Sequence, residues 1–221
     1  DKKGADSTQE GSESYGTDMY LSSMWLVENN IFHHITSAMQ CESGVGGVEA
    51  YNYVFDGFYN ETNPEWFQGS SYTHGACAYI LREGNIGQGF IQDVVHAPNY
   101  FHTALRNRWY GQQNDNFGNP QSLQTVAVHI YAPNRYNNIL GNVLGTTGYH
   151  TKYEAYPASA ADCDTSVFAL GFGGNCGNGT VDNAADVRTS LLRWGNYDTV
   201  NAAVRWQSSE VPTADANYPS S

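Results

Sequence analysis

The stretch LREGNIGQGFIQDVVHAPNYFHTALRNRWYG, residues 81–111, places Asn85 and Asn107 in matching surroundings 22 residues apart. Each asparagine follows a short apolar run and precedes another apolar or aromatic one. The same context recurs in four further segments, LVENNIF (26–32), EAYNYVF (49–55), ILGNVLG (139–145) and LRWGNYD (192–198). A period between about 20 and 50 residues is typical of a solenoid. The repeat therefore predicts a stack of similar coils.

Six asparagines mark these coils, and their spacing indicates a coil of about 22 residues with occasional inserted loops. They are Asn30, Asn52, Asn85, Asn107, Asn142 and Asn196, separated by 22, 33, 22, 35 and 54 residues. Short apolar runs bounded by Gly or Asn favour strands over helices. Strands of neighbouring coils lie about 4.8 Å apart, so stacked asparagines at the bends can hydrogen bond as a ladder. Alternatively, asparagine only marks exposed turns.

The chain divides into one all-β domain and two polar ends. We expect the domain over residues 19–207, a polar N-terminal segment over 1–18 and an extended tail over 208–221. Composition predicts loops near residues 60–75, 111–122 and 145–187. The segment DVRTSLLRW, residues 186–194, comes closest to a helical pattern.

Charge and hydropathy exclude two classes of partner. The 221 residues include 22 acidic and 10 basic side chains, giving a net charge of −12. Nucleic acid and anionic membranes both require a basic face, so we expect neither as a partner. No run of about 18 apolar residues occurs, and membrane insertion is therefore not expected.

The four cysteines form no CxxC motif, which argues against a zinc ribbon or a thioredoxin-like site. Cys41 and Cys77 follow successive repeat segments, and Cys163 and Cys176 flank a glycine-rich stretch. By analogy with secreted proteins we expect two disulfides and a secreted or cell-surface location. Four buried thiols in a reducing compartment are the alternative.

The phrases LVENNIFHHIT, VEAYNYVFDGFY and SLLRWGNYDTV, together with residues 81–111, resemble bacterial secreted proteins of the pectate-lyase-like superfamily. The resemblance covers roughly residues 24–207 and implies a right-handed parallel β-helix. In such proteins the helix usually starts further upstream, so the resemblance also implies that this chain is the C-terminal portion of a longer one. Members include polysaccharide lyases, glycoside hydrolases and non-catalytic surface proteins, and function must come from the site.

Four residues are candidates for catalysis: Asp93, His96, Arg106 and Asp56. Asp93 precedes His96 by three residues and can orient its imidazole for acid–base work. Arg106 can hold the carboxylate of an acidic sugar, and Asp56 lies at a strand end near the same face. The alternative is a set of turn-capping polar groups. The adjacent histidines at 33 and 34 are expected on opposite faces of a strand, which disfavours a shared metal site.

Five further residues are candidates for sugar binding: Glu49, Arg82, Glu83, Trp66 and Trp109. Glu49 and Arg82 precede their asparagines by the same offset, so they are expected side by side on adjacent coils. The favoured alternative is a cross-strand ion pair, worth less than about 1 kcal/mol if exposed. The two tryptophans are either stacking platforms or core residues. A lyase would also need Ca²⁺ held by carboxylates; the sequence assigns no ligands to it.

Two functions remain open from the sequence. The first is an extracellular protein that binds or cleaves polysaccharide in a lyase-like or hydrolase-like groove. The second is a non-catalytic β-solenoid that associates with itself or with an upstream chain.

Overall fold

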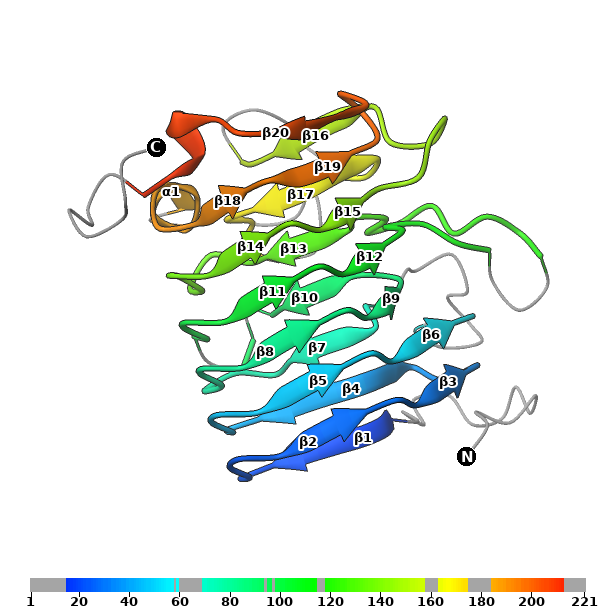
Figure 1. Ribbon diagram of the computed structural model, residues 1–221, viewed down its shortest axis with the longest axis vertical. Coiled ribbons are helices and arrows are strands. Elements are labelled where there is room, and N and C mark those ends of the chain that lie inside the picture. The colour runs from blue at the N-terminus through cyan, green and yellow to red at the C-terminus, as the bar shows by residue number, and fades with distance from the viewer. Residues whose placement is uncertain are drawn as a thin grey trace.

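The computed structural model describes residues 15–57, 59, 69–93, 95–96, 98–114, 118–157, 163–174 and 184–212, and its fold is all-β with parallel sheets. The strands stack in layers along the long axis, from β1–β3 at the N-terminal end to β19 and β20 at the C-terminal end (Figure 1). The described part of the chain contains no helix with the length and hydropathy of a membrane span.

Three sheets contain all the named strands. Sheet 1 has the spatial order β1 (Tyr15–Tyr20), β4 (Ser37–Glu42), β7 (Ser71–Thr73), β10 (Phe90–Gln92), β13 (Val128–Ile130), β17 (Ser166–Leu170), β16 (Lys152–Ala155). Sheet 2 consists of β2 (Leu26–Glu28), β5 (Val48–Ala50), β8 (Leu81–Glu83), β11 (Thr103–Leu105), β14 (Asn138–Leu140) and β18 (Leu192–Trp194). Sheet 3 consists of β3 (Ile31–His33), β6 (Tyr53–Phe55), β9 (Ile86–Gly87), β12 (Arg108–Trp109), β15 (Val143–Leu144), β19 (Asn196–Asp198) and β20 (Ala203–Arg205).

The chain visits the three sheets in turn. From β1 to β15, a strand of sheet 1 is followed by one of sheet 2 and one of sheet 3, and the chain then returns to sheet 1 one layer further along. Both β16 and β17 then belong to sheet 1, before the chain reaches β18 in sheet 2 and β19 in sheet 3. Successive layers pair in parallel, and among the described strands β20 alone pairs antiparallel, with β19. The short helices α1 (Ala184–Thr189) and η1 (Ser208–Glu210) lie near this C-terminal end (Figure 1).

Hydrogen bonds join all six repeat asparagines in one column between sheets 2 and 3. The backbone N–H of each donates to Oδ1 of the next at 2.8–3.1 Å. Each side-chain Nδ2 donates to the same oxygen at 2.9–3.0 Å. The column satisfies polar groups that would otherwise be buried without partners.

The residue before each of these asparagines has a left-handed backbone. These residues are Asn29, Tyr51, Gly84, Arg106, Gly141 and Gly195, with φ between 56° and 67°. Glycine adopts this conformation without steric cost, and it fills three of the six positions. At the three bends where another residue takes the place of glycine, the hydrogen bonds of the asparagine ladder stabilise the left-handed conformation.

A second asparagine pair was not predicted. The backbone N–H and Nδ2 of Asn99 donate to Oδ1 of Asn134 at 2.7 and 2.8 Å, and the N–H of Cys77 donates to Oδ1 of Asn99 at 3.1 Å. Both asparagines end an Ala-Pro-Asn triplet, at 97–99 and 132–134. Their separation of 35 residues equals that between Asn107 and Asn142, and this repeat was the available signal.

The main core lies between the sheets, and a second cluster covers part of the other face of sheet 1. Phe90, Trp109 and Phe168 belong to the main core. Ile91 and Phe172 belong to the second cluster. Successive strand residues point to opposite faces, so Phe90 lies on the inner face of sheet 1 and Ile91 on its outer face.

The expected loops hold more regular structure than predicted. The range 60–75 includes β7, and 145–187 includes β16, β17 and the start of α1. Helix α1 overlaps the first residues of segment 186–194, which came closest to a helical pattern, and the last residues of that segment form β18. Within 111–122, the described residues form only an isolated bridge between Asn114 and Pro120.

One disulfide joins two adjacent layers. Cys41 in β4 and Cys77 after β7 are bonded, with their Cα atoms 6.5 Å apart. Cys163 is also disulfide-bonded, whereas Cys176, its expected partner, lies outside the described residues. The free-thiol alternative is therefore wrong for Cys41, Cys77 and Cys163.

Candidate functional site

Three polar residues follow one another at the same end of neighbouring strands in sheet 1. Cys41 pairs with Thr73, and Thr73 pairs with Gln92. The next residues are Glu42, His74 and Asp93, and the ladder continues through them, because the N–H of His74 donates to the Cys41 carbonyl and that of Asp93 to the Thr73 carbonyl. Consecutive layers therefore place these side chains in one column.

His96 completes a group of four that we call the histidine–carboxylate cluster: Glu42, His74, Asp93 and His96. His74 Nδ1 lies 2.7 Å from Glu42 Oε1, and His96 Nδ1 lies 2.5 Å from Asp93 Oδ2. The two imidazoles stack, with centroids 4.2 Å apart and planes inclined by 23°. Each carboxylate contacts Nδ1 of one imidazole ring and so orients it, and the Nε2 atom of that ring can bind a different partner.

Tyrosines and a further carboxyl surround the cluster. The rings of Tyr72 and Tyr15 approach His74 edge-on, at centroid distances of 4.8 and 6.2 Å. Burial and the charge of Asp93 raise the pKa of Tyr72 well above its usual value. Burial, and then the charge of Glu42, raise the pKa of Asp18. The surroundings thus carry negative charge, which disfavours an anionic ligand.

The cluster is partly open to solvent. The side chain of Asp93 is 4% exposed and that of His74 15%, whereas that of His96 is 48% exposed. The buried members are fixed by their neighbours, and His96 forms the accessible edge. A ligand can reach the cluster from that side.

Two predicted catalytic residues lie elsewhere. Asp56 follows β6 of sheet 3, where its Oδ2 lies 3.2 Å from His33 Nε2 and 3.0 Å from His34 Nδ1. Arg106 follows β11 of sheet 2, is exposed and pairs with Glu83. Neither contacts the cluster through a described interaction, and only Asp93 and His96 of the predicted quartet come together.

His33 and His34 do not point away from each other as strand alternation predicted. His34 has φ of 58°, so the chain leaves the strand geometry there. Both rings then reach the same oxygen of Asp56.

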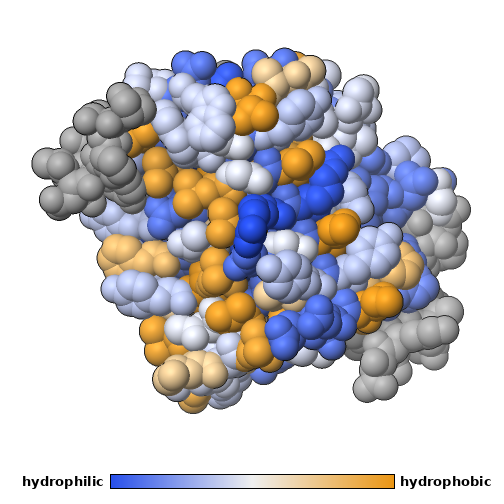
Figure 2. Space-filling model, viewed as in Figure 1, coloured by the Kyte–Doolittle hydropathy of each residue, from blue (hydrophilic) through white to orange (hydrophobic). Residues whose placement is uncertain are grey.

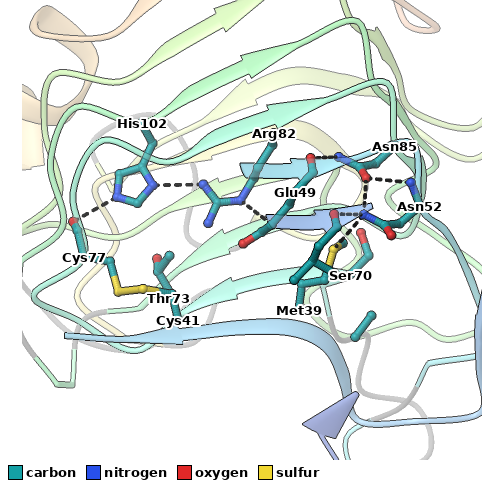
Figure 3. Close-up of polar contacts among 12 residues, drawn as sticks. Met39, Cys41, Glu49, Asn52, Ser70, Thr73, Cys77, Arg82, Asn85 and His102 are labelled. Atoms are coloured by element: carbon teal, nitrogen blue, oxygen red, sulfur yellow. Dashed lines mark hydrogen bonds and ion pairs between the residues drawn. A yellow bond between two sulfur atoms is a disulfide. The ribbon is translucent and has the colours of Figure 1, made fainter. Parts of the chain in front are cut away.

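Glu49 and Arg82 are adjacent as predicted, but they lie inside the molecule and not on its surface. They pair across β5 and β8, and Arg82 Nε lies 3.1 Å from Glu49 Oε2, with both side chains fully buried. Figure 3 shows the pair continuing to His102, whose Nδ1 accepts from Arg82 Nη1 at 2.9 Å. Burial and the adjacent guanidinium hold the pKa of His102 well below its usual value. A sugar-binding role for Glu49 and Arg82 is therefore wrong.

The strand geometry explains this burial. In each three-residue strand of sheet 2 the middle side chain points inward, and Glu49 and Arg82 both hold middle positions. Trp109 is likewise fully buried in the main core and cannot serve as a platform. Glu83 is partly exposed but paired with Arg106. Trp66 lies outside the described residues.

The cluster has the chemistry of a transition-metal site and not of a calcium site. One donor atom from each of His74, Asp93 and His96 lies within 4.8 Å of the others, and this is the one such group among the described residues. Calcium takes six to eight oxygen ligands, whereas two imidazoles and a carboxylate suit zinc, iron, cobalt or nickel.

The sequence reading missed His74 and Glu42. Both come from earlier coils, and the insertion between β6 and β7 hides their alignment with Asp93. Each directly follows a strand residue that pairs in register, namely Cys41 and Thr73, which is the signal that identifies them.

Comparison of this chain with protein-family models, with curated proteins and with solved structures finds no match.

Proposed function

We propose that this protein is an extracellular right-handed parallel β-helix that binds a neutral polysaccharide on the outer face of sheet 1 and hydrolyses it at the histidine–carboxylate cluster. The observation that carries the proposal is the meeting of two carboxylate-bound imidazoles on one partly open face. The three-sheet path of the chain and the asparagine ladder support the β-helix part. The disulfide between Cys41 and Cys77 supports an extracellular location.

Charge favours hydrolysis of a neutral polymer over elimination from an acidic one. A lyase must neutralise the carboxylate of its substrate. Arg106, the residue predicted for this role, pairs with Glu83 at sheet 2, away from the cluster on sheet 1. Glu42 and Asp93 of the cluster, with Asp18 beside them, repel an anionic chain. Hydrolysis of a glycosidic bond needs an activated water and a proton for the leaving oxygen, and the cluster holds the polar groups that both steps require.

The test is a screen of neutral polysaccharides (glucans, mannans, xylans) and acidic ones (polygalacturonate, alginate), with and without calcium. We expect new reducing ends from a neutral polymer and no ultraviolet absorbance from unsaturated products. Unsaturated products from an acidic polymer would contradict the proposed reaction.

Two matched variants locate the site. His96→Ala is expected to abolish release of reducing ends, and His33→Ala to leave it unchanged. Both histidines are about half exposed and lie beside a carboxylate, at 48% and 52% side-chain exposure. Equal activity of wild type and His96→Ala would show that the reaction occurs elsewhere.

A second function, assembly through the end formed by β1–β3, is favoured by exposed apolar side chains there. Leu21, Met24, Leu26 and Ile31 are 58–88% exposed. Figure 2 shows apolar and polar residues interspersed over the viewed face, with orange residues at its lower end. If this end self-associates, light scattering will give a multiple of the 24.3 kDa chain mass, and Ile31→Lys will restore the monomer. Val143→Lys, in the same column four layers away, is the control.

A further inference from the structure

We propose that His74, Asp93 and His96 form a binding site for one divalent transition-metal ion, with Zn²⁺ as the expected occupant. One donor atom from each residue lies within 4.8 Å of the others. The residues come from two neighbouring layers of sheet 1 and from the bend after β10, so the scaffold and not a single loop sets their spacing. This inference deepens the proposed function, because it concerns the same cluster, but metal binding does not depend on activity toward carbohydrate.

Glu42 orients His74 for this role. Its Oε1 lies 2.7 Å from Nδ1 of His74, so the imidazole donates Nδ1–H to the carboxylate and presents Nε2 as a metal ligand. Gln40 Nε2 donates to the same oxygen at 3.1 Å and holds the carboxylate in place. A carboxylate behind a ligating histidine fixes the ring and raises its basicity.

His96 is the ligand that moves when the ion binds. Two imidazoles direct their in-plane lone pairs at a shared metal, whereas the two rings here are stacked, 23° from parallel. Tetrahedral Zn–N distances of about 2.0–2.1 Å place ligand atoms about 3.4 Å apart. The half-exposed side chain of His96 can rotate to this position, exchanging its hydrogen bond to Asp93 for a metal bond. Asp93 and His74 are more buried and stay where they are.

The ligand set leaves room for a reactive water. Three protein ligands are typical of catalytic zinc sites, in which the fourth position holds water or substrate. A metal ion in this position lowers the pKa of its water and supplies a nucleophile at neutral pH. In the proposed hydrolysis the water oxygen would bond to the anomeric carbon as the glycosidic bond breaks, one proton of the water would pass to solvent, and the leaving glycosidic oxygen would take one proton from solvent. The net reaction consumes one water and needs no redox partner.

Metal binding is tested without any carbohydrate. The chain is stripped with chelator, and Zn²⁺ binding is measured by calorimetry, with Co²⁺ as a spectroscopic probe of coordination geometry. We expect one equivalent of Zn²⁺ and the visible bands of tetrahedral cobalt. His74→Ala, Asp93→Asn and His96→Ala are each expected to weaken binding at least tenfold. Glu42→Gln, which removes only the orienting charge, is expected to weaken it about 10–100-fold.

The control is the double variant His33→Ala/His34→Ala. It removes two surface histidines that share a carboxylate, Asp56, and is expected to bind Zn²⁺ like the wild type. Circular dichroism of every variant shows whether the fold is retained. No binding by the folded wild-type chain, or binding lost equally in the control, overturns the inference. If zinc binds but no polysaccharide is cleaved, the metal site stands and the proposed hydrolysis falls.

Discussion

Replacing Asn85 with Ala tests whether the asparagine ladder stabilises the stack. Asn85 lies in the middle of the column and is almost fully buried. Its Oδ1 accepts from the N–H and the Nδ2 of Asn52 at 2.9 and 3.0 Å, and its Nδ2 donates to the carbonyl of Glu49 at 2.7 Å and to Oδ1 of Asn107 at 3.0 Å. Alanine removes all four bonds and leaves the backbone unchanged.

The magnitude follows from the groups left without partners. The Asn52 side chain retains a bond to the carbonyl of Val27, and Asn107 Oδ1 still accepts from the N–H of residue 85. The N–H of Asn52 and the carbonyl of Glu49 lose their side-chain partner in a buried setting. Each unsatisfied buried group costs about 1–3 kcal/mol, so for these two groups we expect Asn85→Ala to lower the free energy of unfolding by about 2–6 kcal/mol.

Asn30→Ala is the matched comparison at the end of the column. Asn30 is exposed, and its Nδ2 bonds to Glu28 and Asn52 can be replaced by water. We expect a loss below about 1 kcal/mol. Urea unfolding followed by circular dichroism gives both values. Equal losses at the two positions would show that burial of unpaired polar groups does not explain the stability of the ladder.

Three further predictions concern other parts of the interior. Burial lowers the pKa of His129 from 6.5 to about 3, so the unfolded chain takes up this proton first as the pH falls. The free energy of unfolding therefore falls progressively below pH 6.5, by about 2 kcal/mol between pH 7 and pH 5. His129→Phe should make this fall about 2 kcal/mol smaller, as measured by urea titrations at the two pH values. A fall as large as that of the wild type would contradict the prediction. Glu49→Gln leaves the Arg82 charge unpaired in the core and should cost about 3–5 kcal/mol. The double change Glu49→Leu/Arg82→Met should cost less than Glu49→Gln alone, and a larger cost would argue against the ion pair. Replacing Cys41 and Cys77 by Ala opens a loop with a sequence separation of 36 residues. The free energy of unfolding, measured in urea, should fall by about 4 kcal/mol. A value equal to that of the wild type would show that the disulfide does not stabilise the stacked layers.

The stacking of parallel strands was predictable because the asparagines recur at the same bend in successive layers. Which side chains point inward was not predictable, because strands of two or three residues are too short for an alternating pattern to distinguish buried from exposed positions. Glu49 and Arg82 were expected on the surface for this reason and are buried. Asp93 and His96 were predictable as a pair because they are close in sequence. His74 joins them only through the register of β7 against β10, which the variable loop lengths conceal.

The ladder has a consequence for how this chain tolerates change. Its asparagines are separated by between 22 and 54 residues, yet their hydrogen-bond lengths hardly vary. The separations of 33 and 35 residues arise in the connections from sheet 3 to sheet 1, between β6 and β7 and between β12 and β13. Segments inserted there leave the registration of the layers intact. Loops that begin at these points can be replaced without changing the strands. Ligand preference near sheet 1 can therefore change while the strands continue to align Glu42, His74 and Asp93.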